Sequence, residues 1–490
     1  MRVQDPGQEG VAIYTQTTYQ DWLTSTDHLA MMAKVISEYK ASPDFLRALE
    51  ADDYFHAMNR AVAGKVILRA DAVTREEKDE AGRRVTRSLQ KKEVPGNRIF
   101  SNFLFRFVTQ QNQYLLGNGV TLEETAQKER LGIGFDKAME QAGEKALLHG
   151  VCWGYWNADH LEVIPAESDA RSGAVALLDE RTGDPGVLIQ FWQLDSKRPM
   201  YVRLFEPDGL TEYRTVEGAL MEIAPKRAYR LTTVSDAAGS YVAGAENYGR
   251  LPVVPFYASD TKRSEFTPAI KSKIDLYDRI LSDFGDNLDK ANDVYWVLNN
   301  FGGTTTEVLE MLQQIEQLKA VVNISDGTGS GSTAEPRAFE VPYTARQTAL
   351  ALLEKALYQD YMAMSMDELT GGSLTNVAIE TAMTNLNLKA DRYEWQAFRF
   401  VQQVLALVGV ETEKISFHRQ VIANRSEIVS DISIMRDYID EETALKLNPY
   451  IAQEDIPKIM QRRAGKMWPV CRTWRPCGRT VTCNGRHGPK

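Results

Sequence analysis

A pair of glycines between two long helical patterns is the feature that most constrains the fold of this 490-residue chain. The stretch DELTGGSLTNVAIETAMTNLNLKADRYEWQAF, residues 367–398, interrupts a helical pattern at Gly371-Gly372 and resumes it a few residues later. A glycine inside a helix costs about 1 kcal/mol relative to alanine, but it permits backbone conformations that other residues resist. We therefore expect a flexible joint between two packed helices here.

The first long helix, predicted within residues 267–296, is amphipathic. Its apolar positions recur at helical intervals and form one stripe, made of Ile270, Ile274, Tyr277, Ile280, Leu281 and Phe284. The rest of its surface carries a series of aspartates: Asp275, Asp278, Asp283, Asp286 and Asp289. Such a run predicts a solvated helix face, and paired-carboxylate chemistry or metal binding is the alternative. A second long helix is predicted at 344–366 and a third at 377–408.

The remaining patterns place strands between helices. Residues 151–260 hold short β-branched and aromatic runs separated by turn pairs, which predicts an antiparallel β region. Helical patterns precede it, and a charged stretch at 74–93 is typical of an exposed loop or helix end. Between the first two long helices we expect a strand (WVLNNF), a short helix (TTEVLEMLQQIEQLKA), a second strand (VVNIS) and a loop (DGTGSGSTAEP). The predicted fold class is α+β.

Composition and charge argue against several classes of protein. There is no run of about 18 apolar residues, and the first residues lack an apolar signal core, so neither a membrane span nor secretion is expected. The net charge is −10, yet residues 462–490 contain eight basic and no acidic residues. An acidic body with a basic tail argues against a surface that grips DNA, because phosphate affinity comes from lysine and arginine.

The usual motifs of catalysis and cofactor binding are not found in the sequence. There is no GxxxxGK[ST] phosphate loop. His149, Cys152 and His160 are close in sequence, but core packing is the expected role for them. A zinc site needs four nitrogen or sulfur ligands, usually with cysteines paired two to four residues apart, and the tail spaces its cysteines by six: Cys471, Cys477 and Cys483, followed by His487. We expect no metal and no cofactor, and none of these patterns points to enzymatic activity.

Four stretches together resemble one known family. They are NQYLLGNGVTLEE, YGRLPVVPFYASDTKRSEFTPAIKSKIDLYDRILSDFGDNL, WVLNNFGG with the insert that follows it, and LTGGSLTNVAIETAMTNLNLKA. Their order resembles that of portal proteins of tailed double-stranded DNA bacteriophages, over roughly residues 95–410. The family often has Ser-Gly before the helix that follows its tunnel loop, where this chain has Thr375-Asn376.

The resemblance implies a portal-type division of the chain, with a mixed α/β wing, a two-helix stem, a small α/β clip, a long kinked helix after a tunnel loop, and a helical crown. The implied parts are an N-terminal helical region (1–94), the wing (95–262), the stem helix (263–293), the clip (294–342), the second stem helix (343–368), the tunnel loop (369–376), the long wing helix (377–410), the crown (411–461) and a basic tail (462–490).

The resemblance also implies a function. Such proteins form a ring, usually a dodecamer, at one capsid vertex, through which double-stranded DNA is packaged and ejected. The tunnel loop would face DNA, with Gly371, Gly372, Ser373, Leu374, Thr375 and Asn376. The aspartates of the stem would line the channel and repel the DNA backbone. The packaging terminase and later a tail adaptor would dock on the clip, at Glu307, Glu310, Gln314, Glu316 and Asp326.

Further partners implied are the major capsid and scaffolding proteins, and the implied location is the virion, with the host cytoplasm during assembly. Two other functions stay open at this point. One is a metal-dependent nuclease or hydrolase that uses the aspartate series with His149 and His160. The other is an oligomeric adaptor without a DNA channel.

Overall fold

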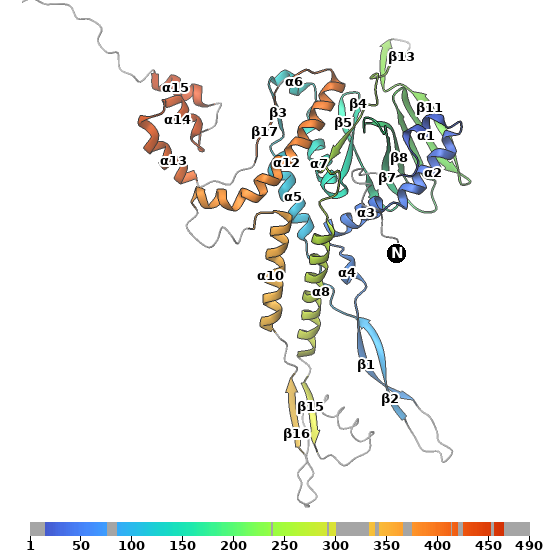
Figure 1. Ribbon diagram of the computed structural model, residues 1–490, viewed down its shortest axis with the longest axis vertical. Helices are drawn as coiled ribbons and strands as arrows, with labels where there is room; N and C mark the ends of the chain where they lie inside the picture. The colour runs from blue at the N-terminus through green and yellow to red at the C-terminus, as the bar shows by residue number, and fades with distance from the viewer. Residues whose placement is uncertain are drawn as a thin grey trace, which may run out of the picture. The chain divides into compact units, whose positions relative to one another are not determined.

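The computed structural model describes residues 15–75, 86–236, 239–291, 294–299, 333–338, 343–365, 375–412, 414–419, 425–451 and 455–464. The chain forms two compact units: Met1–Ser365 with Met383–Val421, and Met366–Ala382 with Ile422–Lys490. Both α-helices and antiparallel sheets are present, which confirms the α+β class (Figure 1).

The helices of the first unit begin and end where the sequence supplies capping residues. Ser42 caps the helix that Pro43 begins, and Gly150, with a left-handed φ of 89°, ends another. The helices are α1 (Tyr19–Thr24), α2 (His28–Lys40), α3 (Pro43–Phe55), α4 (Arg60–Ala63), α5 (Phe103–Leu116), α6 (Thr125–Glu129), α7 (Phe135–His149), α8 (Pro268–Ala291), α10 (Tyr343–Tyr361) and the larger part of α12 (Asn376–Val408).

The strands pair antiparallel throughout the described residues. A six-stranded sheet has the order β11-β10-β9-β8-β7-β6, and a three-stranded sheet has the order β14-β4-β5. Their bounds are β4 (Val151–Asn157), β5 (His160–Pro165), β6 (Glu167–Asp169), β7 (Ser172–Leu178), β8 (Pro185–Trp192), β9 (Tyr201–Glu206), β10 (Gly209–Val216), β11 (Ala219–Arg227) and β14 (Val253–Tyr257). These strands confirm the antiparallel region predicted at 151–260.

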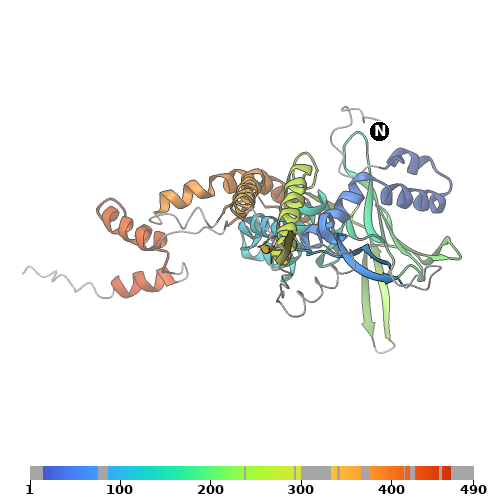
Figure 2. The same ribbon diagram turned by 90° about the horizontal axis from the view of Figure 1, so that it is seen from below.

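Two-stranded ladders complete the first unit. They are β1 (Val66–Arg75) with β2 (Thr86–Pro95), β12 (Arg230–Asp236) with β13 (Gly239–Glu246), β15 (Val294–Asn299) with β16 (Thr333–Ala338), and β17 (Ile415–Phe417) with β3 (Val120–Leu122). The β12–β13 hairpin projects away from the six-stranded sheet (Figure 2).

Strand β4 lies between two hydrophobic cores. Its side chains alternate, so that Val151, Trp153 and Tyr155 belong to one core and Cys152 and Trp156 to the other, because successive residues of a strand point to opposite faces. The first core also contains side chains of α1, α2 and the six-stranded sheet. The second contains those of α5, α7, α12 and the first half of α8.

Helices α5, α7 and α12 approach closely at Gly143. A Cβ atom at this position would lie 2.6 Å from Oδ1 of Asn112 and 2.8 Å from a methyl carbon of Leu116. Oδ1 of Asn112 accepts a hydrogen bond from the Tyr393 hydroxyl of α12 at 3.0 Å, and its Nδ2 donates to the Glu140 carbonyl at 2.8 Å. The glycine therefore makes room for a buried, hydrogen-bonded junction of three helices.

The described helices of the second unit are short. They are α13 (Arg425–Ile434), a 3₁₀ turn (Met435–Asp437), α14 (Glu441–Leu447) and α15 (Ile456–Ala464), besides the first turns of α12. The carboxylate of Asp440 caps α14 by accepting the backbone N–H of Thr443 at 3.0 Å. The part of the chain expected to form a helical crown thus contains separate short helices, because a capping aspartate begins a new helix within it.

Three sequence predictions about secondary structure are wrong. The charged stretch 74–93 was expected to be a loop or helix end, but β1 and β2 pair over its ends, from Val66↔Pro95 to Arg75↔Thr86. The predicted N-terminal helical region therefore contains a hairpin. Residues 333–336, expected in a loop, belong to β16, which pairs with β15. Strands β2 and β16 each contain several polar or charged residues, and cross-strand pairing overrides local composition.

Candidate functional site on helix α8

Helix α8 packs by the apolar stripe that its sequence predicts. Ile270 and Ile274 are buried in the second core. The Tyr277 ring meets that of Phe103 edge to face, with centroids 5.0 Å apart. Helices α8 and α10 lie side by side (Figures 1 and 2).

The first aspartate of the series is tied to the N-terminal helices. The carboxylate of Asp275 accepts a hydrogen bond from the Tyr54 hydroxyl of α3 and pairs with Lys271 at 2.6 Å. Burial and this carboxylate raise the pKa of Tyr54. Asp275 thus fixes α3 against α8 and is not a free surface charge.

Asp278 is fully buried, at 0% exposure. Its Oδ1 accepts the backbone N–H of Ser101 at 3.0 Å, and its Oδ2 accepts Nδ2 of Asn59. One turn further along, the buried Ser282 hydroxyl accepts the backbone N–H of Ile99 at 3.0 Å. Burial raises the pKa of Asp278, against the lowering effect of these donors. The carboxylate therefore satisfies groups of a neighbouring segment.

The last aspartates bind a lysine and an asparagine. Nζ of Lys65 lies 2.6 Å from Asp286 and 2.8 Å from Asp283. Asp286 also accepts the backbone N–H of Asn97 at 2.7 Å, and Asp289 accepts Nδ2 of Asn97 at 2.6 Å. Burial opposes ionisation of Asp286, but Lys65 and Asn97 outweigh it and lower the pKa of this carboxyl below its usual range.

The expectation of one solvated acidic face is therefore wrong for Asp278 and Asp286, which are both buried within one chain. Asp283 and Asp289 remain exposed. The sequence does not indicate the partners Asn59, Lys65, Asn97 and Ser101, because they lie about 180 to 220 residues away in the chain. Helical periodicity groups residues on a face but does not say what covers that face.

The tunnel loop predicted from the sequence is described only at its end. Gly371, Gly372, Ser373 and Leu374 lie outside the described residues. The Thr375 hydroxyl accepts the backbone N–H of Ala378 at 3.3 Å, and the backbone N–H of Asn376 donates to Glu427 at 2.6 Å. Thr375 thus acts as the N-terminal cap of α12.

The clip residues predicted from the sequence also lie outside the described residues: Glu307, Glu310, Gln314, Glu316 and Asp326. What the structure describes there is the β15–β16 ladder, with Val294 opposite Ala338 and Asn299 opposite Thr333. Cys471, Cys477, Cys483 and His487 fall outside as well.

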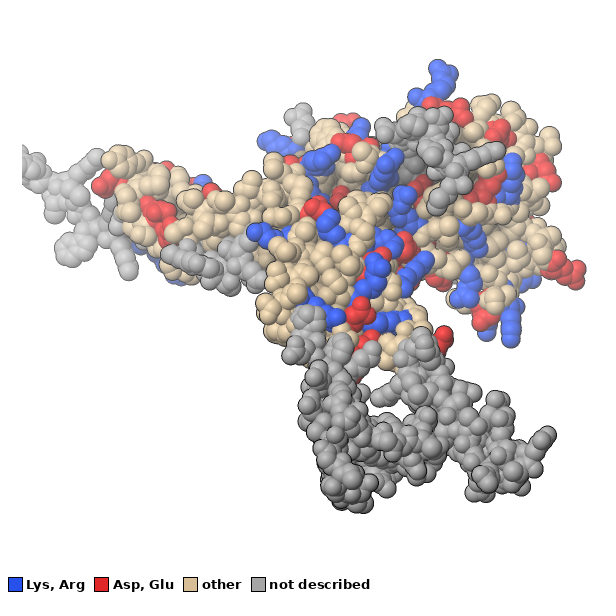
Figure 3. Space-filling model, turned by 60° about the horizontal axis from the view of Figure 1, so that its bottom comes forward, with Lys and Arg blue, Asp and Glu red and all other residues tan. Residues whose placement is uncertain are grey.

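Lysine and arginine lie interspersed with aspartate and glutamate on the face seen in Figure 3. No single-sign region covers the described part of this face. Among the described helices, none is long and apolar enough to cross a membrane.

The histidines considered for an enzyme do not converge with the aspartates of α8. His160 is exposed, with Nδ1 2.8 Å from Asp159. Burial raises the pKa of the Cys152 thiol to about 12, so this thiol stays protonated at neutral pH. His149 is buried at the end of α7, where Nε2 lies 3.2 Å from Oδ1 of Asp52 and 3.9 Å from Oε2 of Glu167.

This buried cluster was not predicted, because its members are distant in sequence. Burial lowers the pKa of His149. Burial and the nearby Asp52 carboxylate raise the pKa of Glu167 to about 9. Burial opposes ionisation of Asp52, but His149 and Lys145 outweigh this effect and hold the pKa of Asp52 below its usual range.

Comparison with known proteins points to one family. A family model described as phage portal protein, SPP1 Gp6-like, matches residues 47–466. The chain is 25% identical over 272 residues to a portal protein of Clostridium phage phiCD119, covering 53% of this chain and 59% of that protein. It is 27% identical over 233 residues to the portal protein of Bacillus phage SPP1, covering 44% of this chain and 45% of that protein. The chain thus spans about half the length of the curated relatives it matches.

Proposed function

Since the chain belongs to the SPP1 Gp6-like family of phage portal proteins, we propose that copies of it form the ring at one capsid vertex through which double-stranded DNA enters and leaves the head. The family is structural and non-enzymatic. The single observation that carries the proposal is the family match across residues 47–466, which includes most of α3 and all of α4 through α15.

The long helices take the parts of a portal stem and wing in this proposal. Helices α8 and α10 are the two stem helices, the β15–β16 ladder belongs to the clip, and α12 is the long wing helix. Helices α13 to α15 form the crown. The packing of α8 beside α10, with the Phe284 and Tyr343 rings 5.7 Å apart, supports a paired stem.

The channel wall is proposed to repel DNA. Asp283 and Asp289 are the members of the α8 series that are exposed, so they are the ones assigned to the channel. DNA carries one negative charge per about 1.7 Å of its axis, and a wall of carboxylates lets it pass without being held. Asp278 and Asp286 instead hold Asn59, Lys65, Asn97 and Ser101 against the stem.

The Gly371-Gly372 joint is proposed as the part that moves against passing DNA, within a tunnel loop of residues 369–376. The cap that Thr375 provides would keep α12 intact while the loop changes shape. Replacing both glycines with alanine should reduce the DNA packaged per head. Normal packaging and retention of DNA would count against this role.

The ring is proposed to contain about twelve subunits, related by one head-to-tail interface that closes on itself. Its clip, with Glu307, Glu310, Gln314, Glu316 and Asp326, would receive the packaging terminase during assembly in the host cytoplasm and a tail adaptor afterwards. Major capsid and scaffolding proteins would contact the rest of the ring in the virion.

The experiment that tests this function uses a phage that encodes the chain. An early stop codon in the gene should abolish DNA-filled heads, and the gene supplied from a plasmid should restore them. Heads are counted by electron microscopy, and their DNA is measured after nuclease treatment. DNA-filled, tailed particles made in the absence of the chain would refute the proposal.

A further inference from the structure

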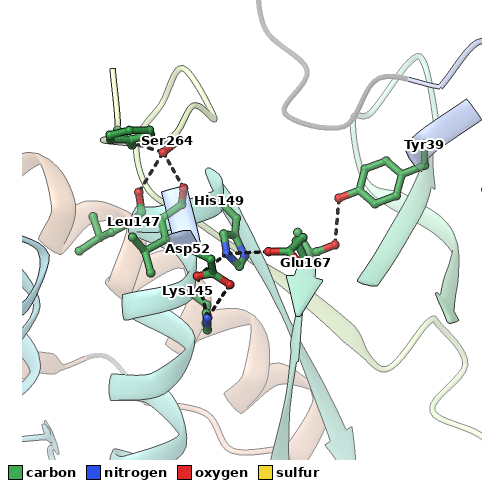
Figure 4. A network of polar contacts seen from close by, with 10 residues as sticks. Tyr39, Asp52, Lys145, Leu147, His149, Glu167 and Ser264 are labelled. Atoms are coloured by element: carbon green, nitrogen blue, oxygen red, sulfur yellow. Dashed lines mark hydrogen bonds and ion pairs between the residues drawn. The ribbon is translucent and has the colours of Figure 1, made fainter. Parts of the chain in front are cut away.

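Three side chains from separate elements meet in the interior of the first unit. Asp52 comes from α3, His149 from the last residue of α7, and Glu167 from the first residue of β6. Figure 4 shows the His149 ring between the two carboxylates, with Lys145 on the far side of Asp52. One ligand atom from each of the three lies within 4.8 Å of the others.

The cluster is deeply buried and poorly hydrogen-bonded. The His149 and Glu167 side chains are 0% exposed, and that of Asp52 is 13% exposed. Nε2 of His149 faces Oδ1 of Asp52 at 3.2 Å, but Nδ1 of His149 and both oxygens of Glu167 have no hydrogen bond of regular geometry to any described residue. Buried polar atoms are rarely left in this condition, and an ion or a water is the usual explanation.

From this geometry we propose that Asp52, His149 and Glu167 bind a structural divalent metal ion, of which Zn²⁺ is the best match. Ligand atoms on a tetrahedral zinc ion stand about 3.4 Å apart. Nε2 of His149 is 3.2 Å from the Asp52 oxygen and 3.9 Å from the Glu167 oxygen. One imidazole nitrogen and two carboxylate oxygens form a donor set that zinc accepts.

The charge of a nearby lysine is compatible with this assignment. Nζ of Lys145 lies 3.0 and 3.2 Å from the two oxygens of Asp52, so the lysine can keep one oxygen while a metal takes the other.

The ion would connect three elements that are distant in the sequence. It would join α3 to the end of α7 and to the edge strand of the six-stranded sheet, where Glu167 pairs with Gly173. Nearby, the Tyr39 hydroxyl donates a hydrogen bond to the backbone carbonyl of Ala166 at 3.0 Å. The site is therefore a structural one, and it does not depend on the proposed function.

The test is the metal content of the full chain, purified without a polyhistidine tag and without chelators. The parent chain and every variant compared with it carry Cys471→Ser, Cys477→Ser and Cys483→Ser, so that the cysteines of the tail cannot bind zinc. We expect about one zinc ion per chain by inductively coupled plasma mass spectrometry. Adding Zn²⁺ to chelator-treated protein should raise its thermal midpoint, and Co²⁺ in its place should give the visible spectrum of a four-coordinate ion.

Glu167→Gln and Asp52→Asn keep the side-chain shapes but remove a charged ligand, so each should weaken zinc binding tenfold or more. Asp159→Asn is the matched control, because this exposed aspartate also lies beside a histidine, and it should leave zinc binding unchanged. The proposal would be overturned if the purified parent chain contained no zinc and gained no thermal stability from added Zn²⁺. It would also be overturned if the folded Glu167→Gln variant retained its full zinc content. The zinc content of the parent chain decides whether the site exists, even if a variant fails to fold.

Discussion

Replacing Lys65 with methionine should loosen the contact between α8 and the segment around residue 97. Methionine keeps the apolar part of the side chain and removes the ammonium group. The Lys65 side chain is 15% exposed and that of Asp286 is 6% exposed. The replacement therefore leaves a buried carboxylate with the backbone N–H of Asn97 as its remaining strong donor among the described residues.

The size of the effect follows from this geometry. Breaking a buried ion pair by removing one partner costs about 3–5 kcal/mol. The retained hydrogen bond from Asn97, 2.7 Å long, reduces this, and we expect about 2 kcal/mol of local stability to be lost. That corresponds to about a 30-fold faster exchange of the amide hydrogens of α8 near residues 283–290, since each 1.4 kcal/mol is a factor of ten.

The effect should depend on pH in a defined direction. Lys65 lowers the pKa of Asp286 in the folded chain, so the pair stabilises the fold above the ordinary aspartate pKa of about 3.9 and loses this contribution as pH falls through the lowered value. Wild type and Lys65→Met should therefore differ most at pH 6–8 and converge in acid.

Hydrogen exchange measured by mass spectrometry on peptides from α8 and residues 96–101 makes this test. Asp283→Asn is the control, because Asp283 is 60% exposed and an exposed pair contributes at most about 1 kcal/mol. Equal exchange in wild type and Lys65→Met at pH 7 would refute the reasoning. A difference in hydrogen exchange between the two proteins that is as large at pH 3 as at pH 7 would also refute it.

Three further predictions concern stability and reactivity. Gly143→Ala should lower the thermal midpoint of unfolding, because overpacking costs about 1–3 kcal/mol and this exceeds the gain in helix propensity. Gly134→Ala is its control and should not lower the midpoint, because nothing lies within 4 Å of a Cβ atom added there. Asp278→Ala should destabilise the first unit by about 2–4 kcal/mol, since it leaves buried donors unsatisfied, whereas Asp289→Ala should cost little. Equal thermal midpoints for these two variants would contradict this prediction. The Cys152 thiol, with its pKa raised to about 12, should resist iodoacetamide in native protein at pH 8 and react in urea, as read by peptide mass spectrometry.

The sequence predicted those elements whose signals are local. The first long helix, predicted within residues 267–296, corresponds to α8, and the third, predicted at 377–408, corresponds to α12. Apolar periodicity and glycine caps act within a few residues, so one sequence suffices to read them. The β1–β2 hairpin was missed because its strands are charged, and charge predicts exposure but not pairing.

The candidate site needed three-dimensional information. The α8 aspartates were found by their spacing, but the burial of Asp278 follows from Ser101 and Asn59, far away in the chain. Likewise, His149 was grouped with Cys152 and His160 by proximity in sequence, whereas the fold places it beside Asp52 and Glu167. Contacts between distant segments depend on the topology, and a single sequence does not supply it.

Electron microscopy of the purified chain, with class averages viewed down the symmetry axis, tests the central claim most directly. A portal protein should form a hollow ring of about twelve or thirteen subunits, closed by one repeated head-to-tail interface. A monomer, a dimer or a solid particle at concentrations where portal rings assemble would contradict the account.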